Sequence, residues 1–285
     1  MPLPDKHKFP MHKYAAVRYL VEQHGLIVLE PPRAEWQLVE TVHQHDYLHK
    51  LRFGTLSPKE TRLLGFPWSP MLVERALRAV GGTLSAARDA LSIGLGINLA
   101  GGTHHAYPDH GEGFCVLNDV AISTLELLRT GLNRVLVLDL DVHQGNGTAF
   151  IFTNDPRVCT ISVHGERNYP FHKESSSLDI ALPDGITDTA YLAILEQQVL
   201  PAVAAFQPDI VFYLAGVDVL ERDQFGRFAL SLIGAKQRDT RVFEFCHTAQ
   251  IPIVSLMAGG YNKNPDITPI AHANTVFAAL EVFGA

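Results

Sequence analysis

The sequence predicts an α/β protein with a mostly parallel central sheet covered by helices on both faces. Short apolar runs that end in Gly, Asp or His alternate with helix-like stretches, which is typical of strands buried on both sides. The predicted strands are Gly96–Ala100, Arg134–Leu140, Val158–Val163, Asp209–Ala215 and Ile251–Met257. The stretches between them open at capping residues or close at Gly or Pro, which indicates helices. These predicted helices are Leu72–Ser92, Asn118–Arg129, Thr189–Phe206, Ser231–Thr248 and Thr268–Phe283.

The composition is that of an ordinary globular chain. Its 285 residues are 47% hydrophobic and 19% charged, which excludes a collagenous or disordered protein. No stretch in the middle of the chain has the composition of a linker, so we expect one domain over residues 1–285.

Charge and cysteine usage narrow the partners and the compartment. Lys and Arg number 23 against 30 Asp and Glu, with no long basic run, so we expect no nucleic-acid partner and instead cationic or neutral ones. No export signal and no uninterrupted apolar window of membrane-spanning length is present, so no membrane span is expected. The three cysteines are far apart and form no C-x-x-C pair, which favours a reducing cytoplasm.

Polar residues gather directly after the predicted strands. The first run is followed by Gly101–His105, which presents two adjacent histidines, and the second leads into Asp139–Gly147. In open α/β sheets, ligands bind beyond the carboxyl ends of the strands. These segments are therefore where the chemistry is expected.

The second of these segments has the spacing of a metal site. Along an extended strand, period two places Asp139, Asp141 and His143 on one face. A carboxylate and an imidazole together suit a zinc-like cation, whose catalytic sites need three protein ligands plus water. Asp218 leaves another strand end in the same layer and is the candidate third ligand. Several acids beside apolar strands would be costly to bury without a cation.

The fifth run ends in Ala258-Gly259-Gly260-Tyr261-Asn262, a glycine turn that presents a phenol. A phenol at a strand end can donate a hydrogen bond to a developing oxyanion. Together with the histidine pair and the acids, Tyr261 completes the set of groups that a metal-assisted hydrolase needs.

These residues lie within segments that resemble a known family. GGTHHAYPDHGEGFCVLND, DLDVHQGNGTA, AGVDVLERDQFG and AGGYN occur in this order, and together they resemble the zinc-dependent histone deacetylases and their bacterial relatives. The segment DLDVHQGNG and the compact length of the chain most resemble the class IV-like branch of this family. The resemblance implies an arginase/deacetylase-like three-layer fold and a single catalytic domain over residues 1–285.

The resemblance also implies roles for the polar residues. One zinc ion per chain would be held by Asp141, His143 and Asp218. His105 would be the general base and acid. His104 would be its electrostatic companion, oriented by Asp139.

Further roles follow from the same resemblance. Tyr261 would polarise the substrate carbonyl opposite the metal. The tunnel for an acyl-lysine side chain would include Gly113 and Phe114, with Gly260 near its floor. A structural potassium site would match Asp139, Asp141, His143 and Ser162.

Asn146 is a departure from many members of the family, which have an aspartate beside the general base. An amide can fix the tautomer of His105 but cannot offset the charge of an imidazolium. We therefore expect His105 to be neutral at rest.

The function predicted on this basis is hydrolysis of acetyl or longer acyl groups from lysine side chains. The alternatives are deacetylation of a small acylated amine such as an acetylpolyamine, and a catalytically silent module that binds acyl-lysine. An arginase-like two-metal site would require a second carboxylate where Leu220 follows Asp218. The sequence does not specify the acyl chain, the physiological substrate or the oligomeric state.

Overall fold

The computed structural model describes residues 1–284 and contains a six-stranded sheet whose strand pairs are all parallel. The strand order is β1-β6-β5-β2-β3-β4. The strands are β1 (Leu95–Asn98), β2 (Val135–Asp139), β3 (Val158–Gly165), β4 (Leu178–Leu182), β5 (Ile210–Leu214) and β6 (Ile253–Leu256). The predicted α/β architecture with a parallel sheet is confirmed.

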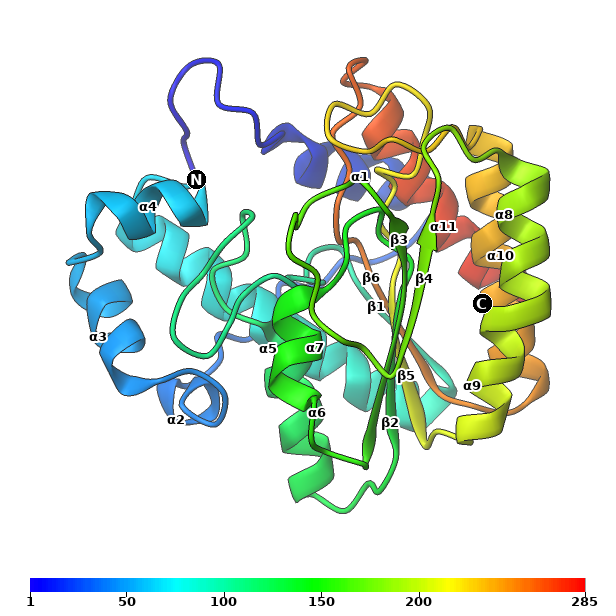
Figure 1. The fold of residues 1–285 in the computed structure, drawn as a ribbon, viewed down its shortest axis with the longest axis horizontal. Coiled ribbons are helices and arrows are strands. Elements are labelled where there is room, and N and C mark those ends of the chain that lie inside the picture. Colours follow the sequence, from blue (N-terminus) through cyan, green and yellow to red (C-terminus); the bar gives the residue numbers. More distant parts are fainter. Residues whose placement is uncertain (285) are drawn as a thin grey trace.

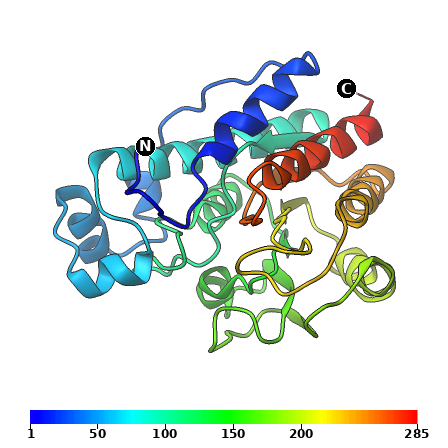
Figure 2. The ribbon, with the colours of Figure 1, turned by 90° about the horizontal axis from the view of Figure 1, so that it is seen from above.

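Helices cover both faces of the sheet, as Figures 1 and 2 show. Those before β3 are α1 (His12–Gln23), α2 (Trp36–Val39), α3 (His45–Phe53), α4 (Pro58–Leu64), α5 (Pro70–Ile93), α6 (Asp119–Arg129) and α7 (Asn146–Phe152). Those after β4 are α8 (Asp188–Ile194), the π-helical turn η1 (Leu195–Val199), α9 (Leu200–Phe206), α10 (Leu232–Thr248) and α11 (Ile267–Phe283).

Strand β2 illustrates why the sheet has two apolar faces. Its alternate residues Val135 and Val137 pack in the cluster that contains α5 and α6. Leu136 and Leu138 point the other way, into the cluster that contains α8, α9, α10 and part of α11. Because successive side chains of a strand alternate between faces, a wholly apolar run requires cover on both sides. The result is three layers, helices on sheet on helices.

Five of the six strands are predicted to within about two residues, but β4 is not predicted. Leu178–Leu182 is an edge strand that pairs only with β3, and its residues alternate between exposed and more buried positions. A search for continuous apolar runs finds strands that are covered on both faces. It misses this strand because Asp179 interrupts the apolar residues, and Asp179 and Ala181 are exposed.

The predicted helix Thr189–Phe206 is present but interrupted. The α8 and α9 segments are joined by η1, which directly precedes Pro201 at the second position of α9. Proline has no backbone N–H to continue the helical ladder, and π turns are where such a helix adjusts.

The same stretch, Asp188–Phe206, has the length and mean hydropathy (1.2) of a helix that could cross a membrane. Leu195 and Val199 are nevertheless buried against the sheet, while the exposed face includes Glu196, Gln197 and Gln198. A polar outer face and an apolar inner face are typical of a helix that covers a sheet.

The first 70 residues, for which the run pattern gives no strand or helix, form four helices beside the sheet. Helix α1 packs against α11 through a small cluster that includes Val17 and Val21. The segment before α1 joins α3, α4 and the start of α5 in a second cluster, to which Phe9 and Tyr261 belong. This N-terminal region therefore forms one side of the space above the strand ends.

Candidate active site

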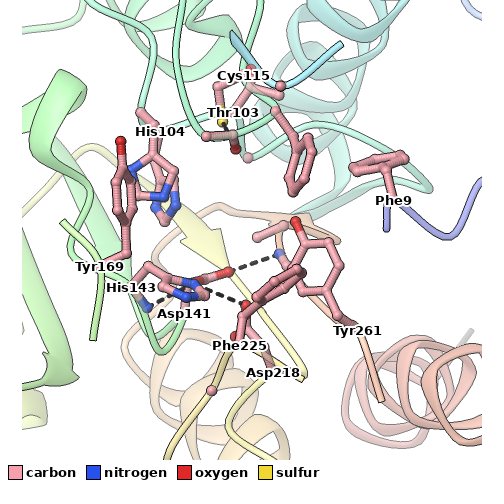
Figure 3. Close-up of a pocket in the computed structure, with 18 of the residues that line it drawn as sticks. Phe9, Thr103, His104, Cys115, Asp141, His143, Tyr169, Asp218, Phe225 and Tyr261 are labelled. Atoms are coloured by element: carbon pink, nitrogen blue, oxygen red, sulfur yellow. Dashed lines mark hydrogen bonds and ion pairs between the residues drawn. The ribbon is translucent and has the colours of Figure 1, made fainter. Parts of the chain in front are cut away.

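The polar segments singled out in the sequence meet at one end of the sheet. Loops that follow β1, β2, β3, β5 and β6 surround a cavity of about 640 Å³. Figure 3 shows Asp141, His143 and Asp218 grouped at its base, with His104 and Tyr169 to one side and Tyr261 to the other. The expectation that the chemistry gathers at the carboxyl ends of the strands agrees with this arrangement.

Asp141, His143 and Asp218 form a compact, buried group that could hold a metal ion. One ligand atom from each residue lies within 4.8 Å of the other two. Nδ1 of His143 is 3.1 Å from Oδ1 of Asp141 and 3.2 Å from Oδ2 of Asp218. The three side chains come from the loops after β2 and β5, which are neighbours in the sheet.

The surroundings of this group fit a cation. Backbone N–H groups hold the acids in place: Gly259 donates to Oδ2 of Asp141 (2.7 Å), and Val142 donates to Oδ1 of Asp218 (3.0 Å). Oδ2 of Asp218 is fully buried; Nδ1 of His143 lies 3.2 Å away, but no well-formed hydrogen bond reaches this oxygen within residues 1–284. Two carboxylates buried this close together need a positive charge to compensate them. Carboxylate oxygens with an imidazole nitrogen are a ligand set that suits zinc.

Two glycines are required beside these carboxylates. A Cβ atom at Gly259 would collide with the carboxylate of Asp218, and one at Gly216 would collide with that of Asp141. The glycine turns after β5 and β6 therefore allow the backbone to approach the acids closely.

The prediction that Asp139, Asp141 and His143 share one face of an extended strand is wrong in its geometry. Strand β2 ends at Asp139, and the next residues form a loop. There, Asp139 accepts a hydrogen bond from the N–H of Asp141 (3.1 Å), and Asp141 accepts one from the N–H of His143 (2.9 Å). Aspartate side chains commonly bond the backbone two residues onward and so stabilise a turn. Asp141 and His143 converge on Asp218, while Asp139 faces His104.

The histidine pair lies beside this group. Nδ1 of His104 is 2.6 Å from Oδ2 of Asp139. Burial alone would lower the pKa of His104, but the carboxylate of Asp139 outweighs burial and raises the pKa to about 9. Burial lowers the pKa of His105 well below its usual value, and the imidazoles of His104 and His143 lower it further. This direction agrees with the expectation that His105 is neutral at rest.

The contact between Asn146 and His105 includes a third residue that sequence reasoning missed. Oδ1 of Asn146 lies 2.6 Å from Nδ1 of His105, and its Nδ2 donates to Glu112 (2.6 Å). A carboxylate only accepts hydrogen bonds, so Glu112 turns the amide nitrogen toward itself and the amide oxygen toward His105. His105 must then have its proton on Nδ1, which leaves Nε2 free to accept one. Glu112 lies within the quoted segment DHGEGFC, but nothing in the linear sequence pairs it with Asn146.

Tyr261 is fixed from two directions. Its ring packs near Phe225 at 5.0 Å and near Phe114 at 6.0 Å between centroids. Its backbone N–H donates to Oδ2 of Asp223 (2.7 Å), whose other oxygen accepts from the loop at Phe225 (2.8 Å). Burial and the carboxylates of Asp218 and Asp141 raise the pKa of Tyr261 well above its ordinary value, so the hydroxyl stays protonated and able to donate. Asp223 was not singled out in the sequence.

The predicted tunnel residues are only partly brought together. Gly113 and Phe114 line the cavity, and Tyr169 lines it with its ring 5.1 Å from that of His105. Gly260 is buried but is not part of the lining, which instead includes its neighbours Gly259 and Tyr261. Ser162, expected at a potassium site, is buried, and its hydroxyl lies 3.0 Å from Nδ1 of His164.

A fully buried arginine donates hydrogen bonds to the backbone just after two of the strands. Nη1 of Arg238, in α10, donates to the carbonyls of Leu140 (3.1 Å) and Gly216 (2.8 Å), and the side chain pairs with Asp239. These carbonyls directly follow β2 and β5, so Arg238 ties together the two segments that supply the metal-ligand candidates. An arginine within an amphipathic helix gives no sequence signal for this role.

The chain is similar in sequence and in fold to known proteins. Residues 7–276 match the model of the histone deacetylase domain. The chain is 43% identical to an uncharacterized protein of Picosynechococcus sp., covering 99% of this chain and 96% of that one. It is 32% identical to histone deacetylase 2 of Arabidopsis thaliana, covering 93% and 72%. Its fold matches the crystal structure of the HDA15 HD domain with a TM-score of 0.80 at 23% identity, over 99% of this chain and 84% of that one.

Proposed function

Because the chain belongs to the histone deacetylase family, we propose that it is a zinc-dependent hydrolase that removes acetyl or longer acyl groups from lysine side chains. The observation behind this proposal is the group Asp141, His143 and Asp218 at the base of a cavity that His105 and Tyr261 also line. A zinc ion held by these three residues supplies Lewis-acid activation of water and of the amide carbonyl.

We assign the remaining chemistry to the chain's own side chains. His105, with its proton on Nδ1, accepts a proton from the attacking water at Nε2 and returns it to the leaving amine. His104, paired with Asp139, provides positive charge beside that exchange. The protonated hydroxyl of Tyr261 donates to the carbonyl oxygen as negative charge develops there.

The shape of the cavity supports a substrate with an extended aliphatic chain. Its walls include the aromatic rings of Phe114, Tyr169 and Phe225, with the glycine at 113 allowing close approach. Rings and glycines suit a run of methylenes that leads to a reacting amide. All the proposed ligands, the base and the tyrosine are present, which favours an enzyme over a silent binding module.

Three further assignments belong to this proposal. Residues 1–285 act as one catalytic domain of the class IV-like branch, which the match over 7–276 and the segment DLDVHQGNG support. Its compartment is the cytoplasm, since three unpaired cysteines suit a reducing environment. The same proposal includes a structural potassium site, which Asp139, Asp141, His143 and Ser162 would surround.

Zinc-loaded protein assayed on lysine peptides that differ only in their acyl group, from acetyl to long-chain, tests the proposal. We expect cleavage, and we expect Asp141→Ala to abolish it. Cleavage of acetylpolyamines but of no peptide would replace the lysine substrate with a small amine. Wild-type turnover in folded Asp141→Ala would refute the metal site.

A further inference from the structure

The mouth of the cavity is basic although the protein is acidic. Of the charged residues that line the cavity, the carboxylates are Asp141 and Asp218, both buried. The exposed charged side chains are three arginines, contributed by α4, by the loop after β3 and by the loop after β5. They are Arg62, Arg167 and Arg227.

A second hollow adjoins this mouth and has the same sign of charge. It shares Phe9 and Gln224 with the cavity, and its lining includes three exposed lysines: Lys6, Lys8 and Lys263. Lys8 lies 5.7 Å over the ring of Phe225, itself a wall of the cavity. No aspartate or glutamate of residues 1–284 lines the second hollow. We call these three arginines and three lysines the basic rim.

The basic rim is largely uncompensated. Within the described part of the chain, only Arg227 forms an ion pair, with Asp184 at 3.2 Å. Asp5 and Glu166 neighbour rim residues in the sequence but line neither hollow. The chain has 30 acidic and 23 basic residues, but six exposed cations and no exposed acid line these two hollows, which reverses the overall balance there.

We infer that the basic rim selects acyl-lysines that are flanked by acidic residues, so that the substrate is an acidic peptide segment. Carboxylates on either side of the acylated lysine would lie against unpaired cations, which speeds encounter and favours the bound state. An acylated polyamine keeps other ammonium groups, and a lysine-rich segment keeps its own positive charge, so both are repelled. Net charge alone suggests cationic or neutral partners, because it averages over the whole surface.

The expected size of the effect follows from the exposure of these side chains. Each exposed ion pair is weak and screened by salt, so several pairs together amount to roughly tenfold in kcat/KM. The inference rests on the proposed function, because it concerns the substrate of the same site.

The test compares two peptides with the same acyl-lysine, one flanked by glutamates and one by lysines. At about 20 mM salt we expect kcat/KM to be roughly tenfold higher for the acidic peptide, and the ratio to approach one near 500 mM. In the double variant Arg62→Glu/Arg167→Glu the preference should disappear or reverse. The control Arg88→Glu, an exposed arginine that lines neither hollow, should keep it.

Fluorescence anisotropy with the same labelled peptides provides a readout that does not depend on turnover, and the acidic peptide should bind more tightly. Equal kcat/KM and equal binding for the two peptides would overturn the inference while leaving the proposed function intact. Better hydrolysis of acetylpolyamines than of the acidic peptide would also overturn it. Absence of any amide cleavage would instead count against the proposed function.

Discussion

The base of the cavity and its rim differ in how their charges are held. At the base, Asp141 and Asp218 are buried and fixed by backbone N–H groups from Gly259 and Val142. At the rim, arginines and lysines are exposed and mostly unpaired. Fixed, dehydrated groups act strongly on a reacting bond, whereas mobile, hydrated groups act weakly on a wide range of partners. The base therefore determines the reaction, and the rim determines which substrates reach it.

The largest expected effect comes from a substitution that removes a hydrogen-bond donor at the base of the cavity and changes no charge there. Tyr261→Phe removes only the hydroxyl, since the ring contacts with Phe225 and Phe114 remain possible. Loss of one donor to a developing oxyanion typically costs about 10²- to 10³-fold in kcat. Zinc content measured alongside turnover should be unchanged. Normal kcat in the zinc-bound variant would contradict the role given to Tyr261.

The next prediction concerns how the general base His105 is positioned. Glu112→Ala removes the group that orients Asn146, so kcat should fall about tenfold, the equivalent of roughly 1.4 kcal/mol of lost hydrogen bonding. Glu112→Gln offers an oxygen to the same amide nitrogen and should retain most of the activity.

The matched control exchanges the carboxylate and the amide between positions 112 and 146. Asn146→Asp alone places two carboxylates at hydrogen-bond distance and should lower kcat. In Glu112→Gln/Asn146→Asp an amide can donate to the new aspartate, so activity should recover. A double variant no better than Asn146→Asp alone would rule out this arrangement.

The last effect is on stability and leaves turnover at neutral pH unchanged; it concerns the segment that His43 holds in place. Nδ1 of His43 lies 2.9 Å from the carbonyl of Tyr107, and its Nε2 accepts from the N–H of Asn118 (2.9 Å), which ties down both ends of segment 107–118. Burial lowers the pKa of His43 to about 4.

Between pH 6.5 and 4 the unfolded chain takes up a proton at His43 that the folded protein does not, so the free energy of unfolding falls with pH by up to ~3 kcal/mol. Urea unfolding across this range should show the loss. His43→Gln should be less stable at pH 7 but should lose less on acidification. An equal slope for the variant would contradict the assignment to His43.

The sequence predicts the base of the cavity better than its supports. Asp141, His143, Asp218 and Tyr261 all follow apolar runs, so their convergence follows from the parallel sheet alone. Glu112 and Arg238 act through contacts between segments that are distant in the sequence, and their local patterns are ordinary. The rim is assembled from five separate segments, so no linear charge run reveals it. Strand β4 is not predicted for a related reason, because two of its five residues are exposed and interrupt the apolar run.

Zinc binding to the metal-free protein tests the central claim most directly. Calorimetric titration should give one zinc ion per chain for the wild type and for Asp89→Asn, an exposed aspartate that lines neither hollow. Asp218→Asn, with its fold checked by circular dichroism, should lose this binding because one buried carboxylate ligand is gone. Wild-type affinity in folded Asp218→Asn, or no binding in the wild type, would contradict the assignment of Asp141, His143 and Asp218 as the zinc site.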